Sequence, residues 1–229
     1  MKFIVVTNRR SGSTLLMNLL QKHPKVFAQH ETMGNAKKQN LPYAQVAGML
    51  DRFYSRKEAL EATATGWKIL YEQMYQPIYD YVVARDLKIV HLIRNDLLET
   101  ALWTRGCTDY DARHINILKR YGKVEANIEN TLEYISKLKE NIDFWALKAD
   151  FRILYEGDIT NHSESVKSFY NESRRRELLE FLGCEDMELV TTTLKKVKLV
   201  GKSEDVVSNY QELLEAVENS KVSRYYVDR

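Results

Sequence analysis

One short segment near the amino terminus, Arg10–Leu15, has side chains suited to binding an anion. It combines a guanidinium, three hydroxyl groups and a glycine, between an apolar run at Phe3–Val6 and an amphipathic run at Thr14–Lys22. These runs predict a buried strand followed by a helix, so backbone N–H groups and the positive helix end would converge on the segment. Guanidinium groups pair well with phosphate oxygens, and glycine allows close approach to the backbone. We expect a multiply charged anion to bind here, through Arg10, Ser11, Gly12, Ser13, Thr14 and Leu15.

Two other interpretations of this segment stay open. Ser and Thr favour helix N-termini and Gly favours turns, so an ordinary capped turn is compatible with it. A nucleoside-triphosphate P-loop fits less well, because its GxxxxGK[ST] pattern needs an earlier glycine in register and a lysine before Ser13–Thr14, and both are missing.

A second cation, Arg94, directly follows the apolar run Lys88–Ile93. An arginine at the end of a buried strand can bind a phosphate through two parallel hydrogen bonds. A surface ion pair with Asp96 or Glu99 is the alternative.

The elements that must position these residues alternate between short β-rich runs and amphipathic patterns. This alternation predicts an α/β fold, a single domain over residues 1–229 with a central, mainly parallel β-sheet flanked by helices. We expect strands at 3–6, 26–28, 66–70, 88–93 and 151–155. We expect helices at 14–22, 41–62, 71–84, 97–104, 125–148, 175–182 and 206–217.

Composition narrows the class of protein. The chain has 34 basic and 32 acidic residues, whereas a general nucleic-acid binder needs a concentrated basic excess. The two cysteines, Cys107 and Cys184, lack zinc-site spacing and are too few for a disulfide framework. No apolar run reaches the roughly 18–20 residues of a membrane span, and the apolar start is too short for a signal peptide. We therefore expect a cytoplasmic protein with no metal, no membrane span and no nucleic-acid partner.

Several of these segments resemble one enzyme family in their order along the chain. Arg10–Thr14 resembles the 5′-phosphosulfate loop of PAPS-dependent sulfotransferases, in which a basic residue precedes Ser-Gly-(Thr/Ser)-Thr and an apolar helix. Val90–Asp96 resembles the family's strand that ends in an arginine for the 3′-phosphate. Weaker resemblances extend over nearly the whole chain, at Gly66–Ile69, Leu154–Glu156, Leu199–Lys202 and Val207–Leu213. The resemblance implies a P-loop-like nucleotide-binding architecture and the donor 3′-phosphoadenosine 5′-phosphosulfate (PAPS).

The resemblance also implies catalytic roles. Sulfuryl transfer needs a base for the acceptor hydroxyl, and Glu31 stands where many bacterial and carbohydrate sulfotransferases carry their catalytic glutamate. Its neighbour His30 is the second candidate for the base. Arg10 would stabilise the charge of the transferred group, and Lys68 matches a family position that faces the acceptor.

The 3′-phosphate site departs from the family pattern. Arg94 would bind the phosphate, but the family's serine eight residues later is Leu102 here, which has no donor. We expect Thr100 to substitute for it, with Thr104 close by on the same helix. Lys202 is a further candidate for the donor's phosphate or adenine edge, and a solvated lysine is an equal alternative.

The resulting hypothesis is a sulfotransferase that moves a sulfuryl group from PAPS to a hydroxyl of a small-molecule, carbohydrate or lipid acceptor and releases adenosine 3′,5′-bisphosphate. We expect acceptor selectivity to come from residues 32–64 and 104–127. A small-molecule kinase and a non-catalytic nucleotide-binding protein are the alternatives, and a homodimer is compatible with the sequence.

Overall fold

The computed structural model describes residues 1–106, 123–159, 167–191 and 203–226. The chain divides into two compact units, one formed by residues 1–93 and 145–194 and the other by residues 94–144 and 195–229. Within the described ranges, no helix combines the length and apolar character that crossing a membrane requires.

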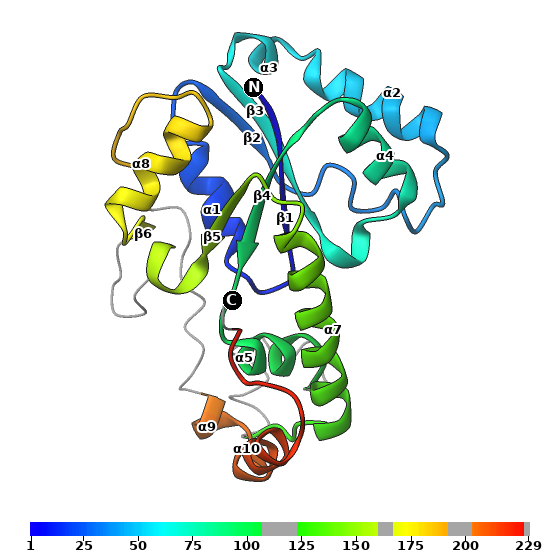
Figure 1. Cartoon of the computed structure of the whole chain (residues 1–229), viewed down its shortest axis with the longest axis vertical. Helices are drawn as coiled ribbons and strands as arrows, with labels where there is room; N and C mark the ends of the chain where they lie inside the picture. Colours follow the sequence, from blue (N-terminus) through cyan, green and yellow to red (C-terminus); the bar gives the residue numbers. More distant parts are fainter. Residues whose placement is uncertain (107–122, 160–166, 192–202, 227–229) are drawn as a thin grey trace. The chain divides into compact units, whose positions relative to one another are not determined.

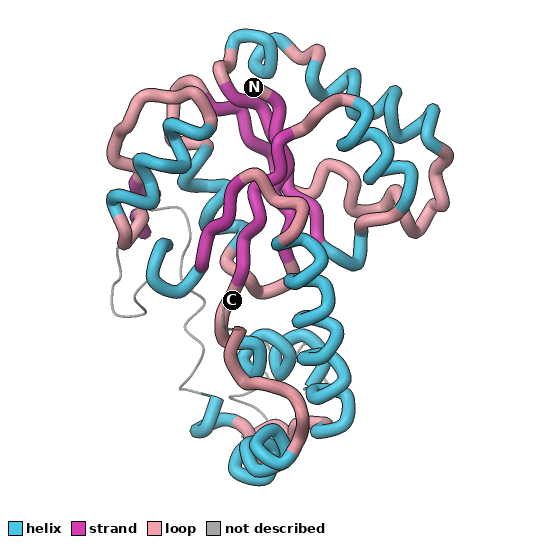
Figure 2. The backbone as a smooth tube through the Cα atoms, viewed as in Figure 1, coloured by secondary structure: helices cyan, strands magenta, loops and turns pink. Residues whose placement is uncertain are grey.

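The first unit is built on a five-stranded sheet in the order β2-β3-β1-β4-β5 (Figures 1 and 2). Every neighbouring pair of strands in it is parallel. Its strands are β1 (Lys2–Thr7), β2 (Val26–Gln29), β3 (Ala64–Leu70), β4 (Lys88–Ile93) and β5 (Phe151–Leu154). All seven residues of β3 and the last five of β1 and β4 are buried, as in a parallel sheet covered on both faces. The predicted α/β fold with a parallel sheet is confirmed.

Helices cover both faces of this sheet (Figure 1). Helices α1 (Ser13–Leu20) and α8 (Glu172–Phe181) lie on one face, and α2 (Tyr43–Tyr54) and α4 (Gln76–Ala84) lie on the other. The short helix α3 (Lys57–Glu61) leads into β3. A two-stranded antiparallel pair, β6 (Lys167–Ser168) with β7 (Val190–Thr191), and an irregular helical segment, η4 (Tyr155–Ile159), complete the described part of this unit.

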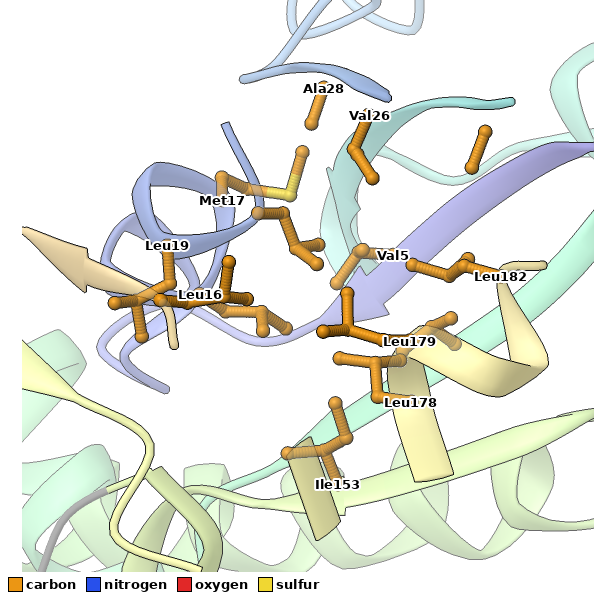
Figure 3. Close-up of a cluster of buried hydrophobic side chains, with 14 of the residues drawn as sticks. Val5, Leu16, Met17, Leu19, Val26, Ala28, Ile153, Leu178, Leu179 and Leu182 are labelled. Atoms are coloured by element: carbon orange, nitrogen blue, oxygen red, sulfur yellow. The ribbon is translucent and has the colours of Figure 1, made fainter. Parts of the chain in front are cut away.

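The core under α1 and α8 is formed by the strand side chains that point to this face of the sheet, together with apolar side chains of the two helices. Val5 of β1, Ile153 of β5, Leu16 of α1 and Leu179 of α8 are all fully buried in one cluster (Figure 3). Burying each such side chain stabilises the fold by about 1.5–3 kcal/mol. This packing holds the start of α1 against the end of β1, and it thereby fixes the loop between them.

The second unit is mainly helical. It contains α5 (Leu97–Ala101), the π-helical turn η2 (Leu102–Gly106), most of α7 (Ile128–Ala146), α9 (Ser203–Val206) and α10 (Tyr210–Asn219). Its carboxyl-terminal segment is tied to the start of α5, because the N–H of Leu97 donates to the carbonyl of Arg224 and the N–H of Tyr226 donates to the carbonyl of Asn95.

Three predicted helices are interrupted. The helix expected at 41–62 divides into α2 and α3, because the backbone at Arg56 between them is extended. The helix expected at 71–84 is a single 3₁₀ turn, η1 (Tyr71–Gln73), followed by α4, whose first turn contains Pro77. Proline fits the first turn of a helix but not its interior. The helix expected at 206–217 is divided before α10, where the Asn209 side chain bonds both backbone groups of Ala126. That one domain spans all residues from 1 to 229 stays a prediction.

Candidate functional site

The predicted anion loop, Arg10–Leu15, includes the end of the connection 8–12 between β1 and α1 and the first three residues of α1, and this connection leaves β1 at the carboxyl edge of the sheet. β1 is the central strand, and the chain crosses from one of its sides to the other between β3 and β4. In open α/β sheets, ligands bind at such a topological switch point. The register pairs Thr7 with Leu70, so β1 and β3 end side by side, and the loop lies next to the residues that follow β3.

Two residues of the loop have left-handed backbone conformations. Gly12 has φ 81° and precedes the first helical residue of α1, and Arg10 has φ 61°. This conformation is natural for glycine, but it costs about 1–2 kcal/mol for a side chain such as that of arginine. Strained backbone conformations cluster at ligand-binding sites. The left-handed backbone at Arg10 is therefore consistent with a binding role for this loop.

Hydrogen bonds hold the loop from beneath. The Thr7 hydroxyl lies 2.8 Å from the Leu92 carbonyl and 2.6 Å from the Ser11 hydroxyl. Because a carbonyl only accepts, Thr7 donates to Leu92 and the Ser11 hydroxyl donates to Thr7. Ser11 is fully buried, and its hydroxyl is engaged with Thr7, so the structure gives it a role in holding the loop. The N–H of Leu15 donates to the Gly12 carbonyl and is engaged within the helix.

Lys68 connects the loop to the predicted base. It lies within β3, 5% exposed, and its Nζ is 3.4 Å from Ser13 Oγ, Thr14 Oγ1 and Glu31 Oε1. An ammonium group has three donors, and these three oxygens match them. The structure therefore brings together Ser13, Thr14, Glu31 and Lys68, four of the predicted site residues, around one buried cation.

Glu31 is held on its second oxygen as well. Gln73 Nε2 donates to Glu31 Oε2 at 2.6 Å, and the Gln73 side chain itself accepts from the N–H of Leu70. Burial raises the pKa of the Glu31 carboxyl, but the Gln73 hydrogen bond and the charges of Lys68 and Arg9 outweigh it, so the pKa lies below its usual value. Glu31 is therefore ionised at neutral pH and able to accept a proton.

His30 has a different environment from Glu31. Its Nε2 lies 3.0 Å from Asn18 Oδ1 of α1. Burial lowers the pKa of His30, the charge of Lys68 lowers it further, and Glu31 opposes both. His30 is therefore neutral at pH 7, and the residues that line the cavity next to Glu31 do not include it.

That cavity has a volume of about 520 Å³. Its lining residues come from the loop, from the segment after β2 and from η1, and they are Arg9, Glu31, Gly34, Asn35, Lys37, Lys38, Glu72 and Gln73. Arg9 and Glu72, which both line it, form an ion pair with each other. The carboxylate of Glu31, 38% exposed, is accessible from this space.

The residues predicted for the 3′-phosphate belong to the second unit. Arg94 is half-buried at the start of that unit, and Lys202 lies outside the described residues. Thr100 is fully buried and its hydroxyl donates to the Asp96 carbonyl, so this geometry favours a role in stabilising the helix. The Thr104 hydroxyl is buried and has no partner among the described residues, which makes it the better candidate to replace the family's serine.

Sequence reasoning missed the supporting residues of the site. Gln73, Arg9 and Glu72 have no motif of their own and enter it only through contacts across the fold. Tyr155 packs so closely on the loop that a Cβ at Gly12 would overlap its ring. Among the described residues, no group of three or more His, Cys, Asp or Glu side chains could hold a metal ion.

The fold has similar counterparts among solved structures. The chain is similar to the sulfotransferase domain from the Synechococcus PCC 7002 olefin synthase, with a TM-score of 0.43 and 15% sequence identity over 93% of this chain and 82% of that chain. No family model and no curated protein matches the chain. A likeness at this TM-score carries no weight for the roles of residues, which rest on the sequence motifs and the geometry of the site.

Proposed function

We propose that the chain is a sulfotransferase that transfers the sulfuryl group of PAPS to an acceptor hydroxyl. The observation that carries the proposal is the position of Lys68, between the hydroxyls of the anion loop and the carboxylate of Glu31. A cation beside both an anion loop and a base can position the two reactants and stabilise the charge that develops between them. The resemblance of Arg10–Thr14 to the family's phosphosulfate loop supports the choice of donor.

In the reaction, the acceptor oxygen forms a bond to sulfur while the bond between sulfur and the 5′-phosphate oxygen breaks. The electron pair of the broken bond stays on adenosine 3′,5′-bisphosphate, and the acceptor's proton passes to Glu31. Arg10, the N–H groups at the start of α1 and Lys68 stabilise the negative charge on the transferred group and the leaving oxygen. By analogy with phosphoryl transfer, positioning and electrostatics make up most of the catalysis.

Gln73 is a positioning residue in this mechanism, and Lys68 positions Glu31 in addition to contributing its positive charge. Each occupies one oxygen of Glu31 and leaves a further lone pair on that oxygen for the acceptor. The interactions of Gln73 and Lys68 with Glu31 also lower the pKa of its carboxyl, which makes Glu31 a weaker base. Loss of the proton from the acceptor must therefore be driven by its bond formation to sulfur rather than by the basicity of Glu31 alone.

The test is release of adenosine 3′,5′-bisphosphate from PAPS in the presence of hydroxylated acceptors. We expect turnover by the wild type and none by Glu31→Gln, with the bisphosphate affinity of that variant unchanged. Tight binding of magnesium-ATP, with no binding of the bisphosphate, would favour the small-molecule kinase. Bisphosphate binding without turnover of any acceptor would favour the non-catalytic nucleotide-binding protein.

A further inference from the structure

Two lysines of the cavity beside Glu31 have no role in the proposed transfer. The charged side chains that line it are three cations, Arg9, Lys37 and Lys38, and two anions, Glu31 and Glu72. Arg9 pairs with Glu72, and Glu31 pairs with Lys68 from beneath. Lys37 and Lys38 have no carboxylate partner among the described residues, so this side of the cavity has an excess of positive charge.

The segment that carries these lysines is a structured turn. Met33 and Ala36 are 1% and 3% exposed and anchor it in the core, while Lys37 and Lys38 are exposed. Backbone bonds from Ala36 to Met33 and from Leu41 to Ala36 close the turn. The Lys37 ammonium also donates to the Met74 carbonyl at 3.3 Å, which leaves two of its three donors for another acceptor.

The rest of the lining is polar. Its uncharged members are Asn35, Gln73 and Gly34, and none of the described lining residues is aromatic or aliphatic. Sites for apolar ligands are lined mainly by hydrophobic and aromatic side chains. The lining residues therefore favour a ligand with many hydrogen-bonding groups over a lipid or a phenol.

We infer that the acceptor is a polyhydroxylated anion whose carboxylate or other acidic group binds Lys37 and Lys38 while one of its hydroxyls contacts Glu31. The inference rests on the proposed function for the role of Glu31. The binding preference itself, for acidic over neutral polyols, follows from the cavity alone.

The experiment compares trigalacturonate with its carboxyl-reduced, neutral counterpart, a pair that differs in charge but not in backbone. Binding is measured by calorimetry on the wild type, Lys37→Ala, Lys38→Ala and the matched control Lys22→Ala, an exposed lysine that does not line the cavity. Transfer of ³⁵S from labelled PAPS to both saccharides is measured in parallel.

We expect the acidic saccharide to bind the wild type at least tenfold more tightly than the neutral one. Each cavity variant should reduce that ratio at least threefold and leave adenosine 3′,5′-bisphosphate binding unchanged, whereas Lys22→Ala should change neither. Equal binding of the two saccharides to the wild type would overturn the inference. So would an acidic-to-neutral affinity ratio that falls as much in Lys22→Ala as in Lys37→Ala and Lys38→Ala.

The two proposals fail separately. If the bisphosphate binds and the acidic saccharide does not, the acceptor inference is wrong and the sulfotransferase proposal stands. If the bisphosphate does not bind, the sulfotransferase proposal is wrong, and the saccharide ratio still decides whether the cavity selects acidic polyols.

Discussion

Replacing Gly12 by alanine perturbs the anion loop at its most constrained point. Gly12 has φ 81°, and a Cβ built there would overlap the ring of Tyr155. The left-handed conformation costs alanine about 1–2 kcal/mol. Overpacking against the ring adds about 1–3 kcal/mol. We therefore expect Gly12→Ala to lower the free energy of unfolding by roughly 2–5 kcal/mol.

Urea unfolding followed by tryptophan fluorescence measures this change, and a double-mutant cycle separates its two parts. In a Tyr155→Ala background the ring is gone, so Gly12→Ala should cost only about 1–2 kcal/mol, from its backbone conformation. Gly48→Ala is the control, because Gly48 lies within α2 and the nearest atom to its added Cβ, in Arg52, is 3.8 Å away. That change should stabilise the protein by up to about 1 kcal/mol. An equal cost of Gly12→Ala in both backgrounds would refute the packing of Tyr155 on the loop.

Three further predictions concern the site. Gln73→Met removes a hydrogen bond that lowers the Glu31 pKa, so that pKa should rise. Because Glu31 acts in its ionised form, the acidic limb of the pH–rate profile should move to higher pH, and an unmoved limb would argue against Glu31 as the base. Thr104→Ala should reduce the preference for adenosine 3′,5′-bisphosphate over adenosine 5′-monophosphate about tenfold, and Thr100→Ala should not, as calorimetry with both nucleotides would show. Gly34→Val should raise the acceptor KM several-fold at constant bisphosphate affinity, because a Cβ there already lies 3.3 Å from Gln73 Nε2 and 3.5 Å from Glu31 Oε2. A change in bisphosphate affinity instead would place Gly34 on the donor side.

The sequence was sufficient to predict the strands of the parallel sheet, because buried strands such as β4 are continuous apolar runs with clear ends. It also predicted that the anion loop follows the first strand. It did not predict the environment of Lys68, because the contacts of that side chain depend on the register between β1 and β3 and on residues 37 to 55 positions away. The prediction that Thr100 binds the 3′-phosphate was limited in the same way. Nothing in the sequence indicates that the Thr100 hydroxyl donates to the Asp96 carbonyl of its own helix.

For the proposed acceptor site, the sequence predicted ranges of residues and not individual side chains. Residues 32–64 and 104–127 were expected to determine acceptor selectivity. Gly34, Asn35, Lys37 and Lys38 of the first range line the cavity beside Glu31, and residues 107–122 of the second range lie outside the described residues. The lining residues Arg9, Glu72 and Gln73 follow two other strands, β1 and β3. The net charge of the cavity depends on which segments of the chain line it. The spacing of residues in the sequence does not show which segments these are.

The most direct test of the account is calorimetry with adenosine 3′,5′-bisphosphate on the wild type and Arg10→Ala. The account predicts that the wild type binds and that Arg10→Ala binds roughly 10- to 100-fold more weakly, as expected when a charged hydrogen bond worth about 1.5–3 kcal/mol is lost. A wild type that does not bind the bisphosphate, or an Arg10→Ala variant that binds it as tightly as the wild type, would contradict the account.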